Sequence, residues 1–202
     1  DLEGGRLLSV PTLGEMLRKA GKQMVSGGSG SPGTTYLTNP TVTGPIVNWA
    51  VTWPQPLADQ IIARYGSPLG PESSSTQRNR FVMQEHLVFI YTKHHPDLVT
   101  LWLTEPDHAQ HAHGISSPEA LAMLREVDED VYQFIDALGG ATPDGLNCLI
   151  LSDHGFSTAN SHVEPEQELA GEGLIDSPDS HEIIRASDSL HLRGHSRERL
   201  GE

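Results

Sequence analysis

The sequence lacks several features that would place it in common classes of protein. A single cysteine, Cys148, occurs among 202 residues, which excludes an internal disulfide. It lies in an apolar run, so we expect it to be a small buried residue. No apolar run approaches the roughly 18–20 residues that a membrane-spanning helix needs, and no signal peptide is recognisable. The scarcity of cysteine does not distinguish between cellular compartments.

Positive charge is also scarce. The chain has 13 basic and 27 acidic residues, for a net charge of −14. An acidic surface repels nucleic-acid backbones and anionic membranes, so the sequence indicates no nucleic-acid-binding surface. Bound metal ions would supply the missing positive charge locally. The composition is therefore compatible with a metalloprotein and equally with an ordinary acidic soluble protein.

Apolar patterning predicts an α/β fold in which a mostly parallel sheet is flanked by helices. Helices are expected at 11–20, 57–65, 76–95, 117–138 and 166–171, and strands at 23–25, 98–104, 146–152 and 183–186. The helix over 117–138 has the clearest pattern, with Ser117 as its N-cap. It joins the strands at 98–104 and 146–152 as the crossover of a parallel βαβ unit. The length suits one domain or a large piece of one, and we interpret residues 1–202 as a single, incomplete domain.

Two strand-like runs each end in residue types that bind metals. The candidate ligands are Asp107 and His111 after the first run, and Asp153 and His154 after the second. The carboxyl ends of parallel strands meet at one edge of a sheet, so we expect these side chains to converge. Mixed carboxylate and imidazole ligands suit zinc, or less specifically manganese or iron. His108 and His113 are interpreted as solvent-facing residues or as neighbours of the ligands.

Three further features allow a functional and a structural interpretation. The glycine-rich stretch at 27–35 follows a strand and is either a phosphate-binding loop or a plain tight loop. It lacks the Lys-Ser/Thr pair of a P-loop and the full GxGxxG pattern. Trp49 and Trp53, in a stretch at 37–56 that we expect to be irregular, either flank a pocket or cap the edge of the core. Arg78 and Arg80 either face a phosphate or lie on a solvated helix face.

The two ligand-bearing segments, EPDHAQHAHG (105–114) and LSDHGFS (151–157), resemble those of a known family. The family is the type I phosphodiesterase/nucleotide pyrophosphatase family of the alkaline phosphatase superfamily. It has an E-P-D-x-x-x-H-x-x-G segment followed later by S-D-H-G. The stretches 11–35 and 94–107 are similar to the family's flanking sequences, and the resemblance covers about 7–188. Gln110, where many relatives have Gly, is a small departure that touches no ligand.

The resemblance implies an alkaline phosphatase-like fold and a site for two divalent ions, most often zinc. Asp107 and His111 would bind one ion, and Asp153 and His154 the other. The family's Thr or Ser nucleophile, another aspartate and a third histidine have no convincing match in this chain, since His195 comes too early. We therefore expect the nucleophile to lie N-terminal to Asp1, which implies a partial domain. The implied substrate is a small phosphodiester or a nucleotide.

Other readings of the same residues remain open. A phosphomonoesterase, phosphonate hydrolase, sulfatase or phosphomutase of the same superfamily would share the ligand segments. A Cys-x-Pro-x-Arg motif, typical of sulfatases, is absent from this chain. A different class is a metal-binding fragment without catalysis. Family resemblance alone favours an extracytoplasmic location, either periplasmic or secreted.

Overall fold

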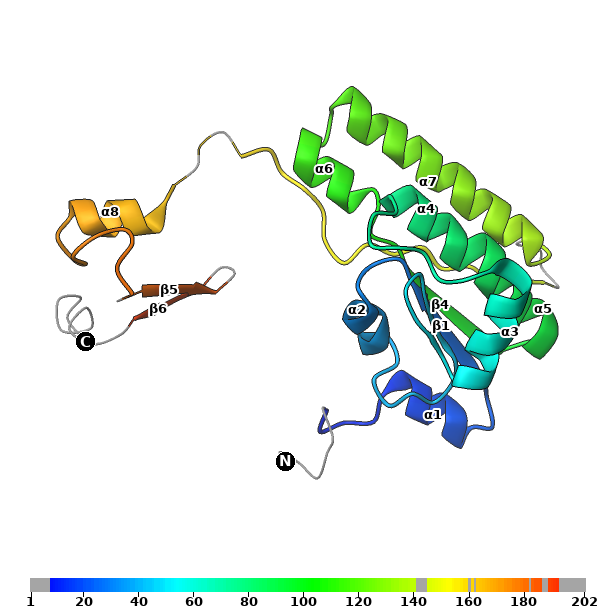
Figure 1. The fold of residues 1–202 in the computed structure, drawn as a ribbon. Coiled ribbons are helices and arrows are strands. Elements are labelled where there is room, and N and C mark those ends of the chain that lie inside the picture. The colour runs from blue at the N-terminus through cyan, green and yellow to red at the C-terminus, as the bar shows by residue number, and fades with distance from the viewer. Residues whose placement is uncertain are drawn as a thin grey trace. The chain divides into compact units, whose positions relative to one another are not determined.

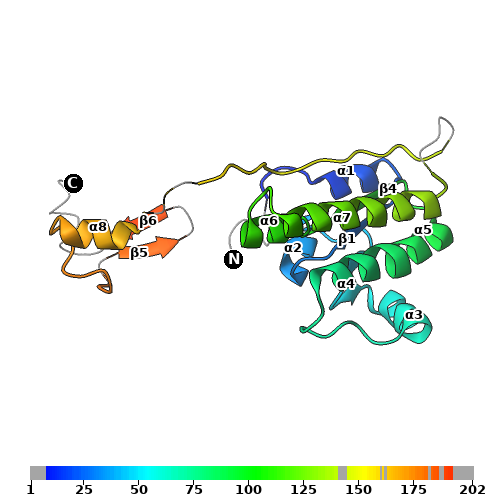
Figure 2. The ribbon, with the colours of Figure 1, turned by 90° about the horizontal axis from the view of Figure 1, so that it is seen from above.

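The computed structural model describes residues 8–140, 145–159, 161, 163–181, 183–186 and 189–192. The chain divides into two compact units, Asp1–Phe156 and Ser157–Glu202 (Figures 1 and 2). His195 and most of the loop expected at 141–145 lie outside the described residues. Within the described ranges, no helix is long and apolar enough to cross a membrane.

A four-stranded sheet with the order β3-β2-β1-β4 lies at the centre of the first unit. Strand β1 (Met24–Gly28) pairs in parallel with β2 (Ile46–Asn48) on one side and with β4 (Leu98–Trp102) on the other. Strand β3 (Thr52–Trp53) runs antiparallel to β2. The predicted α/β class with a mostly parallel sheet is confirmed, as are strands close to 23–25 and 98–104.

Helical segments cover both faces of β1. Neighbouring residues of a strand point to opposite faces of a sheet. A methyl group on Gly27 would contact the π-helical segment η2 (Phe81–Leu87). One on Gly28 would instead contact α2 (Pro32–Leu37). All five residues of β1 are buried as a result, which is the usual condition of a parallel strand.

The other helices of the first unit mostly match the sequence prediction. They are α1 (Leu13–Lys19), α3 (Gln55–Tyr65), α4 (Ser75–Arg80), α5 (Val88–His94), α6 (Asp107–His113) and α7 (Pro118–Ala137). The helix expected over 76–95 is present as α4, η2 and α5 in succession (Figure 1). Side-chain hydroxyls of Thr12, Ser74 and Ser117 cap α1, α4 and α7. Helix α6 was not among the predicted helices.

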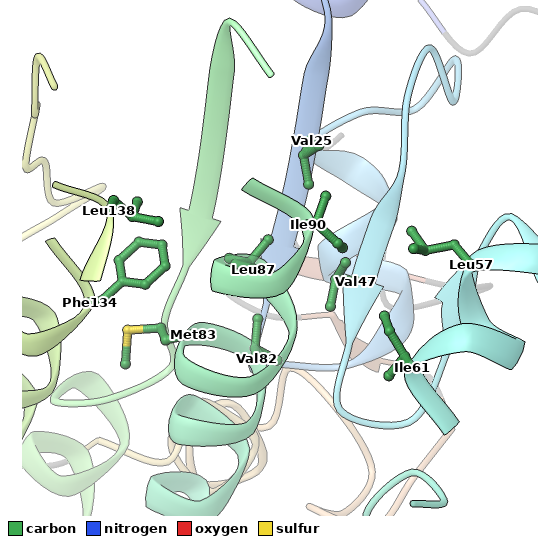
Figure 3. Packing of buried hydrophobic residues seen from close by; sticks show 10 residues of the cluster. All are labelled: Val25, Val47, Leu57, Ile61, Val82, Met83, Leu87, Ile90, Phe134 and Leu138. Atoms are coloured by element: carbon green, nitrogen blue, oxygen red, sulfur yellow. The ribbon is translucent and has the colours of Figure 1, made fainter. Parts of the chain in front are cut away.

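The hydrophobic core lies between the sheet and the helices α3, η2, α5 and α7 (Figure 3). Its buried members are Val25, Val47, Leu57, Ile61, Val82, Met83, Leu87, Ile90, Phe134 and Leu138. Val47 from β2, Val82 and Met83 from η2, and Ile90 from α5 have no measurable exposure. Because the buried side chains come from six elements, β1, β2, α3, η2, α5 and α7, the core fixes the sheet and these helices as one body.

Residues 146–152 do not form the predicted strand. Among the described residues, β4 pairs with β1 alone, and 146–152 have no strand partner. Leu149, Ile150 and Leu151 are 75–80% exposed. Cys148, which we expected to be buried, is exposed as well. An apolar run provides a driving force for burial, but a strand also needs a neighbouring backbone in register, which composition does not supply.

Although unpaired, 146–152 runs close to the open side of β4. Both segments line one groove of about 990 Å³, together with apolar residues of α7. Leu146 packs against the hydrophobic core at the start of the segment. The four residues that follow the segment, Asp153 to Phe156, line the same groove as Asp107. The predicted neighbourhood of the two runs is therefore present without the predicted hydrogen-bonded ladder.

Two other stretches differ from the sequence prediction. The stretch at 37–56, expected to be irregular, contains β2 and β3. Strands of three and two residues are too short to show an apolar alternation. The glycine-rich stretch at 27–35 begins inside β1 and ends inside α2, which leaves only 29–31 as the turn between them.

The second unit contains a helix and a hairpin. Helix α8 (Pro165–Gly171) and strand β5 (Ile183–Ala186) lie where the sequence predicted a short helix and a short strand. Strand β6 (Ser189–Leu192), which pairs antiparallel with β5, was not predicted. Arg185 of β5 lies 3.6 Å from the carboxylate of Glu164, which precedes α8.

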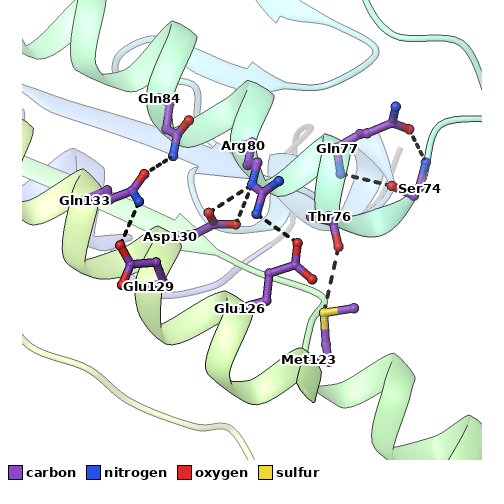
Figure 4. Close-up of polar contacts among 10 residues, drawn as sticks. All are labelled: Ser74, Thr76, Gln77, Arg80, Gln84, Met123, Glu126, Glu129, Asp130 and Gln133. Atoms are coloured by element: carbon purple, nitrogen blue, oxygen red, sulfur yellow. Dashed lines mark hydrogen bonds and ion pairs between the residues drawn. The ribbon is translucent and has the colours of Figure 1, made fainter. Parts of the chain in front are cut away.

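A polar network joins α4 and η2 to α7 (Figure 4). The Nε of Arg80 donates to both carboxylate oxygens of Asp130, at 2.9 and 3.1 Å, and its Nη2 donates to Glu126 at 2.8 Å. Asp130 is 3% exposed at its side chain, whereas Arg80 is 48% exposed. The hydrogen bond from Arg80 to Asp130 raises the pKa of the guanidinium above its ordinary value. Arg80 therefore carries a structural ion pair, in place of the solvated face or phosphate contact considered from the sequence.

We expect Arg80→Ala to destabilise the protein more than Asp130→Ala. Loss of Arg80 leaves a buried carboxylate unpaired, at a cost of about 2–3 kcal/mol, whereas the half-exposed Arg80 is solvated when Asp130 is lost, at about 1–2 kcal/mol. Urea unfolding of both variants measures the difference. Glu126→Ala is the control, with a cost below about 1 kcal/mol because its pair is exposed. Equal losses for all three variants would contradict this asymmetry.

His86 is a buried histidine without a hydrogen-bond partner. Its side chain lies in η2 at 1% exposure, and neither ring nitrogen has a partner among the described residues. The ring packs edge-on against Phe81, with 3.9 Å between centroids. Burial lowers the pKa of His86 from 6.5 to about 4. The folded protein therefore holds this imidazole neutral at pH values where the unfolded chain protonates it.

This pKa difference predicts an acid-dependent loss of stability. Above pH 6.5 the residue is neutral in both states, whereas between pH 6.5 and 4 only the unfolded state takes up the proton. The free energy of unfolding should fall across that window by up to about 3 kcal/mol. His86→Leu should remove this part of the pH dependence, measured by urea unfolding from pH 7.5 to 4. The exposed His94→Leu is the control, and identical profiles for His86→Leu and the unmodified protein would refute the assignment.

Candidate metal centre

Asp107 and His111 project from the same face of α6. They are four residues apart on a helix, which places their side chains one turn from each other. His111 Nε2 lies 3.6 Å from Asp107 Oδ1. Asp107 is in the first turn of α6, where the helix dipole favours an anion. The two side chains predicted as ligands after the first strand therefore lie side by side on α6.

The second predicted pair meets the first. His154 Nε2 lies 3.5 Å from Asp107 Oδ1 and 3.8 Å from Asp153 Oδ2. All four predicted ligands thus lie in one cluster, although Asp153 and His154 follow an unpaired segment and not a strand. Each of the four side chains is between 48% and 66% exposed, so the cluster opens to solvent.

One carboxylate oxygen of the cluster is buried without a hydrogen-bond partner in the described structure. Asp107 Oδ1 is buried, although its side chain as a whole is 48% exposed, and it has no hydrogen-bond partner in the described structure. Two imidazole nitrogens face it at 3.5 and 3.6 Å, too far for hydrogen bonds. Asp107 Oδ1 therefore has two imidazole neighbours but no hydrogen-bond donor in the described structure.

The cluster is not yet a complete coordination shell. Among the residues described, no group of three or more His, Cys, Asp or Glu side chains is arranged so that it could hold a metal ion. The pairwise distances therefore bring the four side chains together without defining a coordination geometry. The chemistry of the donor set, two carboxylates and two imidazoles, suits zinc.

An aromatic side chain that the sequence did not single out completes the cluster. Phe156 contacts the ring of His111 with 4.8 Å between centroids and that of His154 with 5.4 Å, both nearly edge-on. It therefore forms an apolar wall shared by the two imidazoles. Its position two residues after His154 was visible in the sequence, but nothing in the pattern indicated that it would face α6.

The remaining histidines of this region lie apart from the cluster. His108 is 74% exposed at its side chain, with its Nδ1 3.9 Å from the Glu105 carboxylate. His113, in the last turn of α6, is exposed. Both agree with the solvent-facing interpretation. Gln110, the departure from the family pattern, lines the groove beside Asp107.

The turn at 29–31 is held tightly against β2. Asn48 Nδ2 donates to the carbonyl oxygens of Gly28 and Gly30 at 2.8 and 2.9 Å, and Trp49 Nε1 donates to Gly30 at 2.7 Å. The Arg78 guanidinium stacks on the Trp49 ring at 3.9 Å from its centroid. Trp49 and Arg78 thus fasten the turn, while Trp53 is half-exposed. The glycine-rich stretch therefore contains a tight turn held by side-chain hydrogen bonds, as in the tight-loop interpretation.

Comparison with known proteins matches this chain to one family. The family model for type I phosphodiesterase / nucleotide pyrophosphatase matches residues 12–200, which include both ligand segments. No solved structure matches the chain significantly.

Curated relatives are similar over shorter stretches. Human ectonucleotide pyrophosphatase/phosphodiesterase family member 7 is 39% identical over 74 residues, 36% of this chain and 16% of that protein. Rat family member 1 is 41% identical over 62 residues, 30% of this chain and 7% of that protein. The matched stretches are therefore a small part of each relative. Because the family model spans nearly the whole sequence, the chain belongs to the type I phosphodiesterase / nucleotide pyrophosphatase family.

Proposed function

We propose that this chain carries the ligands of a metal-dependent hydrolase of phosphodiester or pyrophosphate bonds. Two divalent ions would be held by Asp107, His111, Asp153 and His154, and this donor set suits zinc. The observation that carries the proposal is the contact between the two segments, which lie more than forty residues apart in the sequence: His154 Nε2 lies 3.5 Å from Asp107 Oδ1. The buried Asp107 Oδ1, which has no hydrogen-bond partner in the described structure, supports it.

The residues of the chain determine how a substrate could be held. Asp107, His111, Asp153 and His154 line an open surface, so a phosphate group can approach from solvent. A net charge of −14 would repel an anionic substrate unless cations are bound at the site. When bound, divalent ions stabilise the charge on a transferring phosphoryl group and lower the pKa of a coordinated hydroxyl. Phe156 would restrict the orientations of the two imidazoles.

We propose that the attacking hydroxyl belongs to a Thr or Ser outside residues 1–202. No residue of the described cluster is a hydroxyl nucleophile: its members are carboxylates, imidazoles and one phenyl ring. Ser152 follows the apolar run, but its Oγ donates to the carbonyl of His154 at 2.5 Å and so is engaged with the backbone. Residues 1–202 would therefore supply the metal ligands and the groove. A segment outside them would supply the nucleophile.

A longer chain that includes the nucleophile segment should hydrolyse phosphodiester or phosphonate model substrates. Residues 1–202 alone should bind zinc weakly and show no turnover. Steady-state assays with and without a chelator, on diester, phosphonate and monoester substrates, test both expectations and separate the related hydrolases. Robust chelator-sensitive hydrolysis by residues 1–202 would contradict the missing nucleophile. Zinc binding without turnover by the longer chain would favour a non-catalytic metal-binding protein.

In that longer chain, Asp153→Ala should abolish hydrolysis because it removes a ligand. We expect a loss of at least about 100-fold in kcat/KM, together with a reduced zinc content. Asp128→Ala, which removes an exposed carboxylate from α7, is the matched control and should retain activity and zinc. Zinc content follows from elemental analysis of the purified variants. Retained activity in Asp153→Ala would remove this residue from the site.

A further inference from the structure

Glu105, two residues before Asp107, is a buried carboxylate with an unusual set of partners. It is 4% exposed, and among the described residues the other buried carboxylate is Asp130. Asp130 is neutralised by Arg80, but the described ion pairs of Glu105 include no lysine or arginine. A buried carboxylate is costly unless its oxygens accept hydrogen bonds. Hydrogen bonds to its two carboxylate oxygens are therefore what stabilises Glu105 in its buried position.

Both carboxylate oxygens of Glu105 accept hydrogen bonds from other elements. Oε1 accepts from the Ser75 hydroxyl, in the first turn of α4, at 2.5 Å. Oε2 accepts from the backbone N–H of Ala109, in the first turn of α6, at 3.1 Å. One side chain thus joins the start of α4 to the start of α6. Since its oxygens are occupied in this way and buried, Glu105 is not available as a metal ligand.

The residue before Glu105 is fastened as well. The backbone N–H of Thr104 donates to the Ser29 Oγ at 3.0 Å, and the two hydroxyls lie 3.2 Å apart. Ser29 in turn follows β1 and donates its own N–H to Trp102 at the end of β4. The chain is therefore anchored at two successive residues, first to the turn after β1 and then to α4, shortly before it enters α6.

We propose that Glu105 is a positioning residue for the metal ligands. Its two hydrogen bonds set the direction in which α6 leaves the end of β4, and this direction holds Asp107 and His111 opposite His154. Helix α6 has seven residues and packs against α7, and the hydrogen bonds of Glu105 add a second anchor at its first turn. The inference rests on the proposed function, because it concerns ligands of that same site.

The test compares two buried carboxylates, Glu105 and Asp130, in the longer chain that includes the nucleophile segment. Glu105→Ala should weaken zinc binding about 10–100-fold, as loss of outer-shell partners commonly does. Asp130→Ala removes the other buried carboxylate, and should lower the melting temperature without changing zinc affinity. Glu105→Gln should recover most of the affinity, because an amide can accept from Ala109 and donate to Ser75. Isothermal titration with zinc chloride measures the affinities, and thermal melts confirm that each variant is folded.

Several outcomes would overturn the inference. Unchanged zinc affinity in a folded Glu105→Ala variant would do so, and so would an equal loss in Asp130→Ala. If Glu105→Ala fails to fold, Ser75→Ala takes its place, with a smaller but measurable loss expected. If the unmodified protein binds no zinc, the proposed function fails. Amide hydrogen exchange then still decides the positioning role: α6, but not α7, should exchange faster in the variant, and equal protection of α6 would refute it.

Discussion

The parallel pairing of β1 with β4 is the constraint on which the candidate site depends. Gly28 and Trp102 are paired at the ends of the two strands, so both strands finish at the same level of the sheet. Hydrogen bonds between Ser29 and Thr104 continue this pairing past the last strand residues. The segment that carries Asp107 therefore leaves the sheet from a fixed point. A shift in the register of β4 would move every candidate ligand on α6 at once.

The site combines a rigid half and a loosely held half. Asp107 and His111 belong to a helix whose first turn is fastened to the sheet and to α4. Asp153 and His154 follow a segment without strand partners, and the apolar residues before them are largely exposed. Contacts of Phe156 with both imidazoles connect the halves. Coupling between metal binding and the order of this second half is expected on general grounds, because ligands held together by an ion lose conformational freedom together.

Sequence patterns predicted the regular parts of the fold well. Helix α7 was predicted almost to the residue, because twenty residues of helical periodicity begin at an unambiguous cap, Ser117. Strand β4 was predicted from a run of apolar residues that a buried strand requires. Strands β2 and β3 were missed because they are too short to show a pattern, and α6 was missed because its composition resembles that of a loop. At 146–152 the patterning failed, since hydrophobicity does not specify a hydrogen-bonding partner.

The sequence by itself determined the identities of the four candidate ligands and their division into two segments. It did so because Asp and His in E-P-D-x-x-x-H-x-x-G and S-D-H-G form a specific pattern that needs no structure to be seen. Only the tertiary structure decided that His154 faces Asp107, that Phe156 contacts both imidazoles, and that Glu105 is buried between α4 and α6. The contacts of His154 with Asp107, of Phe156 with His111 and of Glu105 with Ser75 join residues separated by 30 or more positions, and such long-range contacts depend on how the sheet and helices pack. No local pattern encodes that packing.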